Sequence, residues 1–95
     1  MAPNVLIADK LDPKTVTDLE SMGATVRLVP GLSADDLPGT IGEAEVLVVR
    51  STKVTRATIE AAPSLALIVR AGAGVNTIDM DEASRRGIAV ANCPG

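Results

Sequence analysis

The sequence contains no histidine and no aromatic residue, and its only cysteine is Cys93. The lack of histidine removes the most frequent general base and the most frequent transition-metal ligand. A single cysteine excludes an intramolecular disulfide and an all-cysteine metal site. We therefore expect no catalytic residue and no metal site within these 95 residues. We also interpret Cys93 as a bystander rather than a reactive thiol, since nothing around it suggests activation.

Long hydrophobic runs and an excess of positive charge are also missing. No apolar run approaches the roughly 20 residues that a membrane-spanning helix needs. The start of the chain, Met1 to Asn4, lacks the basic stretch of a signal peptide. The net charge of −3 gives the chain no overall attraction to nucleic acid. These features predict a cytoplasmic protein that binds neither membranes nor nucleic acid, so any anion site must be local.

Short apolar runs alternate with helix-like segments along the whole chain. The runs are continuous and rich in Val, Leu, Ile and Ala, which is typical of strands buried on both faces of a parallel sheet. The expected strands are residues 4–9, 24–29, 45–50, 65–70 and 88–91. The second run alternates more in polarity, so we place it nearer an edge of the sheet. Strict alternation of this kind implies right-handed crossovers. It predicts one α/β domain, a flavodoxin-like three-layer sandwich with strand order 2-1-3-4-5.

Local signals set the expected helices. The first begins at Pro13 and stops at Gly23, with an apolar stripe that includes Met22. The second is short and irregular and has a capping-box-like pair, Ser33 and Asp36. The third begins after a threonine cap and runs to about residue 62, where a proline follows. The fourth begins with a second capping-box-like pair, Asp79 and Glu82, and ends at Gly87. The Arg85–Arg86 pair falls in its last turn, where cations complement the helix dipole.

Four of the nine cationic residues follow the predicted strands. They are Lys10, Arg50, Lys53 and Arg70. Ligands of such sheets bind beyond the carboxyl ends of the strands, at the switch in strand order. Cations gathered there on an acidic protein favour a small anionic ligand. The alternative is that these side chains are simply solvated.

The segment Gly72-Ala73-Gly74-Val75 follows the fourth run. Two glycines at this point can leave amide hydrogens pointing outward as an anion nest. The alternative is a tight turn that binds nothing. A dinucleotide fingerprint is excluded, because Thr77 stands where the third glycine should be. In addition, the next helix begins only after Asp79, and no acidic residue ends the fifth run to hold a ribose.

The run from Val48 to Asp79, with its block Arg70-Ala-Gly-Ala-Gly-Val75, resembles the N-terminal region of the phosphoglycerate dehydrogenases. These belong to the D-isomer-specific 2-hydroxyacid dehydrogenase family. The opening Val5-Leu-Ile-Ala-Asp-Lys-Leu-Asp-Pro13 and the tail from Ala83 to Gly95 fit the same family, so the resemblance covers nearly the whole chain. One departure is Asn76-Thr77, where relatives often have Asp-Asn.

The resemblance implies that residues 1–95 are the N-terminal portion of a substrate-binding domain. It implies a parent enzyme that oxidises 3-phosphoglycerate with NAD in serine biosynthesis. The family's nucleotide-binding domain and its catalytic Arg, Glu and His lie beyond residue 95, so we expect no activity and no bound NAD in this chain alone. The substrate-binding residues carried over by position, or placed by the strand pattern, are Arg50, Ser51, Arg70, Gly72, Ala73, Gly74 and Asn76.

Two further expectations follow from the family resemblance. In the family a helix from a returning segment covers part of this sheet, so an uncovered apolar strip should favour self-association of the chain. The other expected partners are a small anionic 2-hydroxy acid, such as 3-phosphoglycerate, and the remainder of the parent enzyme. The alternative function is a standalone, non-catalytic anion-binding or scaffold domain.

Overall fold

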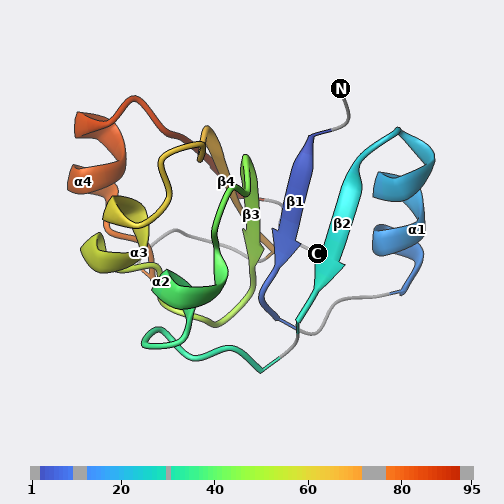
Figure 1. Cartoon of the computed structure of the whole chain (residues 1–95), viewed down its shortest axis with the longest axis horizontal. Coiled ribbons are helices and arrows are strands. Elements are labelled where there is room, and N and C mark those ends of the chain that lie inside the picture. The colour runs from blue at the N-terminus through green and yellow to red at the C-terminus, as the bar shows by residue number, and fades with distance from the viewer. Residues whose placement is uncertain (1–2, 10–12, 30, 72–76, 93–95) are drawn as a thin grey trace.

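The computed structural model of the chain describes residues 3–9, 13–29, 31–71 and 77–92. It contains a five-stranded parallel sheet in the order β2-β1-β3-β4-β5, which confirms the predicted topology (Figure 1). The strands are β1 (Asn4–Ile7), β2 (Thr25–Leu28), β3 (Val46–Val49), β4 (Leu67–Arg70) and β5 (Ala89–Asn92). The helices are α1 (Pro13–Ser21), α2 (Leu37–Thr40), α3 (Arg56–Glu60) and α4 (Met80–Arg85). The first four strands are shorter than the apolar runs that predict them, and β5 begins and ends one residue later than predicted.

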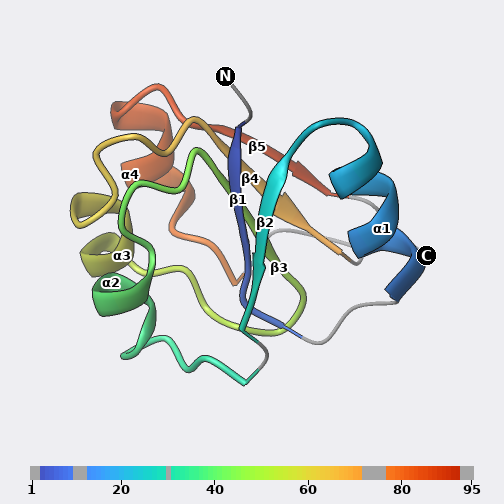
Figure 2. The same ribbon diagram turned by 45° about the vertical axis from the view of Figure 1, so that its right-hand side comes forward.

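The sheet is the middle of three layers, with α2, α3 and α4 on one face and α1 on the other (Figure 2). The larger apolar cluster lies under the three helices, where sheet residues such as Leu6, Leu47 and Ile68 are fully buried. The smaller cluster lies under α1, where Val16 and Leu19 pack against the sheet. Because β1 and β3 bury side chains on both faces, almost every residue in them is apolar, and this is why their sequence shows a run rather than an alternation.

The helix boundaries depart from the sequence prediction in three places. Met22 lies past the end of α1 and is 81% exposed, because the chain turns away at Gly23, whose φ is 95°. The Ser33 and Asp36 side chains do hydrogen-bond at 2.9 Å. They close a turn, however, and α2 starts only at Leu37, since Pro38 is tolerated in a first helical turn. Finally, α3 ends at Glu60 rather than near residue 62.

The α1 side of the sheet is covered unevenly. The α1 helix contacts β2. Because side chains alternate along a strand, β3, β4 and β5 also turn apolar side chains toward the α1 side of the sheet. Of these, Val46, Leu67 and Val69 are half-buried, while Ala89 and Ala91 are exposed. Among the described residues no helix lies over this set, which we call the β3–β5 strip. No helix in the described part of the chain is long and apolar enough to span a bilayer.

Candidate functional site

The carboxyl ends of β1, β3, β4 and β5 meet at one edge of the sheet. The registers pair Ile7 with Val48, Val49 with Arg70, and Arg70 with Asn92. The residues that follow these strands are therefore neighbours in space, although they are far apart in sequence. This arrangement brings Asp9, Arg50 and Ala71 to the same edge, as the strand pattern predicts.

The Asp9 carboxylate binds the backbone that follows β3. Its Oδ2 accepts hydrogen bonds from the backbone N–H groups of Arg50, Ser51 and Thr52, at 2.6, 3.0 and 3.0 Å. Its Oδ1 lies 2.8 Å from the Thr52 hydroxyl. Three successive amides converging on one oxygen form an anion nest. Here the nest is filled by the protein's own carboxylate, so an incoming ligand has the side chains of Arg50 and Ser51 available rather than their amides.

Two opposing effects set the acidity of Asp9. Partial burial raises the pKa of its carboxyl, while the hydrogen bonds from Arg50, Thr52 and Ser51 lower it. The hydrogen bonds together outweigh burial, so the pKa lies below its ordinary value of 3.8. Asp9 is therefore ionised near neutral pH, and its charge is met by amide dipoles, with no ion pair to a cation of a described residue.

The segments on both sides of residues 72–76 hydrogen-bond to the chain that follows β3. On one side, the N–H of Ala71 donates to the carbonyl of Val49 at 2.8 Å. On the other side, the N–H of Val54 donates to the carbonyl of Thr77 at 2.9 Å. The N–H of Asp79 then donates to the carbonyl of Val54, also at 2.9 Å. Val49 and Val54, on either side of residues 50–53, thus hydrogen-bond to the described residues on the two sides of the segment 72–76.

The predicted site residues fall into three groups. Arg50 and Ser51 are exposed at the carboxyl edge, and no carboxylate of a described residue is within ion-pairing distance of the Arg50 guanidinium. Arg70 ends β4 at the same edge but is half-buried, with its Nε buried. The other predicted site residues, Gly72, Ala73, Gly74 and Asn76, lie outside the described residues, as do Lys10 and Cys93.

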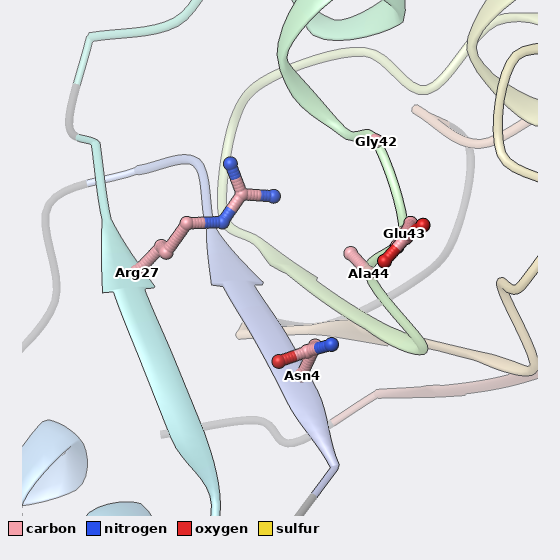
Figure 3. Close-up of a pocket in the computed structure, with 5 residues that line it drawn as sticks. All are labelled: Asn4, Arg27, Gly42, Glu43 and Ala44. Carbon is pink, nitrogen blue, oxygen red and sulfur yellow. The ribbon is translucent and has the colours of Figure 1, made fainter.

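A hollow of about 260 Å³ lies at the opposite edge of the sheet, near the amino ends of β1 and β3. It is lined by Asn4, Arg27, Gly42, Glu43 and Ala44 (Figure 3). The Arg27 guanidinium donates to the carbonyls of Thr40 and Ile41 at 3.1 and 3.0 Å, which satisfies the end of α2. This cation is committed to the fold, so the hollow is a weaker candidate for an anion site than the carboxyl edge.

Comparison with known proteins agrees with this geometry. Residues 5–95 match the family model described as the D-isomer specific 2-hydroxyacid dehydrogenase, catalytic domain. The chain belongs to this family. It is 45% identical over 93 residues to a protein of Mycobacterium tuberculosis named D-3-phosphoglycerate dehydrogenase. It is also 45% identical over 91 residues to a protein of the same name from Methanocaldococcus jannaschii.

Solved structures share the fold of this chain. The PH0520 protein of Pyrococcus horikoshii superposes with a TM-score of 0.92 at 33% identity over 100% of this chain and 28% of that one. An NAD+-bound 3-phosphoglycerate dehydrogenase of Entamoeba histolytica superposes with a TM-score of 0.87 at 26% identity, over 97% of this chain and 33% of that one. The two sequence matches cover 97% and 95% of this chain, but the chain spans only 17% of the length of each relative.

The described residues of this family member do not fit a dinucleotide cofactor. Asp79 caps α4, and its Oδ1 accepts the N–H of Glu82 at 3.1 Å. A carboxylate therefore stands where a pyrophosphate would have to bind the helix N-terminus. The fifth strand ends in Asn92, which lacks the carboxylate that holds a ribose. A pyrophosphate and a ribose therefore find no matching partner at the start of α4 or at the end of β5.

A second polar cluster joins α3 to α4. The Glu82 side chain is only 6% exposed and pairs with Arg86, Arg85 and Arg56 at 2.7, 3.3 and 3.9 Å. The hydrogen bond from Arg86 is the main cause that lowers the pKa of Glu82. The expected capping pair with Asp79 is thus half formed, because the Glu82 carboxylate turns to the arginines instead. The Arg85–Arg86 pair has the structural role that the sequence suggests.

Sequence reasoning assigned no role to Asp9 or to Thr52. The contacts between them join positions more than 40 residues apart. A signal did exist, because an acidic residue directly after a buried strand needs hydrogen-bond donors nearby. Nothing in the sequence shows that the donors are the amides after β3.

Proposed function

We propose that the chain forms the substrate-binding part of an NAD-dependent D-2-hydroxyacid dehydrogenase that oxidises 3-phosphoglycerate. Family membership and the names of its relatives support this assignment. The observation that carries it is the exposed Arg50 at the carboxyl edge, in a segment whose flanking residues Val49 and Val54 hydrogen-bond to the two described ends of the segment 72–76. A guanidinium is suited to a carboxylate or a phosphate, because its planar donors can bind two oxygens at once.

In this proposal the chain supplies half of a cleft. Arg50 and Ser51 contribute side chains, and Arg70 adds positive charge from a more buried position. Backbone amides of Gly72, Ala73 and Gly74 donate to the substrate carboxylate, and Asn76 shapes the turn near the cofactor. These turn residues enter from the sequence resemblance alone. Catalytic groups and NAD belong to the remainder of the enzyme, so the chain alone is inactive.

The isolated chain should bind 3-phosphoglycerate weakly. Its cationic edge is open to water, which screens the attraction between charges. The domain that would close over the substrate and exclude water is not part of these 95 residues. We expect millimolar affinity at best, corresponding to about −4 kcal/mol.

Steady-state kinetics of the full-length protein test this function. R50Q should raise the KM for 3-phosphoglycerate by about ten- to a hundredfold, as expected for loss of a charge-assisted hydrogen bond. The KM for NAD should stay unchanged. R85Q is the matched control, because Arg85 is also exposed but ends α4, away from the carboxyl edge. Equal KM values for R50Q and wild type would refute the proposal, as would no detectable NAD-dependent oxidation of 3-phosphoglycerate by the wild type.

A further inference from the structure

We propose that Asp9 and Thr52 are positioning residues that hold the Arg50-bearing loop, residues 50–53, in the geometry that binds the substrate anion. The inference rests on the proposed function and adds two residues to it. Neither side chain is assigned to contact substrate. Both act through the backbone and the placement of Arg50.

The register of the sheet sets up the contact. Ile7 pairs with Val48, and the N–H of Ala8 donates to the carbonyl of Val48 at 3.0 Å. Two residues further along each segment, Asp9 comes level with Arg50. At this point the backbone ladder between β1 and β3 has ended. The Asp9 carboxylate continues the connection by accepting hydrogen bonds from three successive backbone N–H groups. The first residues of the loop are therefore fixed to β1 by three bonds to one oxygen.

Thr52 extends this connection to a third segment. It is 9% exposed, and its Oγ1 lies 2.8 Å from Asp9 Oδ1 and 3.0 Å from the carbonyl of Leu32. The single hydroxyl hydrogen serves one of these acceptors at a time, and the charged one forms the stronger bond. The Thr52 hydroxyl thus lies where the connections after β1, β2 and β3 converge. Four bonds to Asp9 limit how far the loop can move.

The position of a negative charge at this edge argues for a role in geometry. A carboxylate beside an anion site repels the ligand, which weakens binding. Asp9 nevertheless lies against the loop that carries Arg50, with its oxygens turned to backbone donors. The two effects of removing its charge have opposite signs. Loss of repulsion would lower the KM for an anionic substrate, whereas loss of loop geometry would raise it.

Kinetics of the full-length protein with 3-phosphoglycerate and NAD separate these effects. D9N and T52V should each raise the KM for 3-phosphoglycerate by about tenfold, the change that a displaced guanidinium contact produces. The KM for NAD should stay unchanged. T52S keeps the hydroxyl and should restore a KM within about twofold of wild type. A variant that folds poorly has fewer active molecules and a lower apparent kcat, but its KM still reports the folded fraction, so partial unfolding does not imitate the expected result.

A double-mutant cycle decides whether Asp9 acts through Arg50. In the R50Q background, D9N should cause no further rise in KM, because the group that it positions is gone. Independent, multiplicative effects of D9N and R50Q would overturn the positioning role, as would an unchanged or lowered KM in D9N and T52V. Those results leave the proposed function intact as long as R50Q alone raises KM. An unchanged KM in R50Q refutes the proposed function and the positioning role with it.

Discussion

Replacing Asp9 by alanine should lower the free energy of unfolding of the 95-residue chain by about 2 kcal/mol. The carboxylate accepts four hydrogen bonds, from the amides of Arg50, Ser51 and Thr52 and from the Thr52 hydroxyl. The first two donors are exposed and can turn to water. The Thr52 hydroxyl can turn to the carbonyl of Leu32, but the partly buried amide of Thr52 is left without an acceptor, which costs about 2 kcal/mol.

Urea unfolding at neutral pH measures this loss. The midpoint should fall while the slope with denaturant stays constant, since the surface exposed on unfolding hardly changes. In a thermal scan of a domain this size, the loss corresponds to a fall in Tm of roughly 8–16 °C. Asp18→Ala is the control, because Asp18 is exposed on α1 and no hydrogen bond of its carboxylate ties the described loops together. If D9A unfolds with the same midpoint as D18A, the carboxylate does not hold this loop.

The comparison of wild type with D9A also gives a pH test. The pKa of Asp9 is lowered in the folded chain, so the carboxylate contributes stability above its unfolded pKa of 3.8. That contribution is lost as the pH falls through the lower, folded value. The difference in free energy of unfolding between wild type and D9A should therefore be constant above about pH 5, and this gap should narrow below about pH 4. A gap that stays constant or widens down to about pH 2.5 contradicts the hydrogen-bond assignment.

Two other predictions concern packing. Thr58 in α3 is fully buried, and its Oγ1 has no hydrogen-bond partner among the described residues, so Thr58→Val should stabilise the chain by about 1 kcal/mol; a lower urea midpoint would show that the hydroxyl has a partner. The β3–β5 strip should cause concentration-dependent self-association, and Val69→Lys in the strip should suppress it, as measured by light scattering. A wild-type chain that stays monomeric at high concentration would rule this out.

The sheet could be predicted from the sequence, and much of the site could not. Strands such as β3, Val46–Val49, are buried on both faces, so an uninterrupted apolar run records their position directly. The edge placement of β2 followed from its more alternating pattern. Helix ends were less certain, because α2 and α3 are short and are stabilised mainly by packing.

The function of Asp9 could not be predicted for a different reason. Its partners are backbone amides, which every residue carries, and they are brought to it by the register of two strands. Arg50 was predicted as a site residue because a guanidinium at a strand end is informative by residue type alone. Side-chain chemistry can therefore be read from the sequence, whereas an anion nest depends on backbone geometry that residue types do not record.

The central claim is that the carboxyl edge of the sheet binds a small acid through Arg50. A titration of the ¹⁵N-labelled chain with 3-phosphoglycerate, followed by NMR, tests it most directly. Amide shifts should move at residues 50–52, 71 and 77, and the R50A variant should lose these changes. Shifts that map instead to the hollow around Arg27 and Gly42, or that persist unchanged in R50A, would contradict the claim.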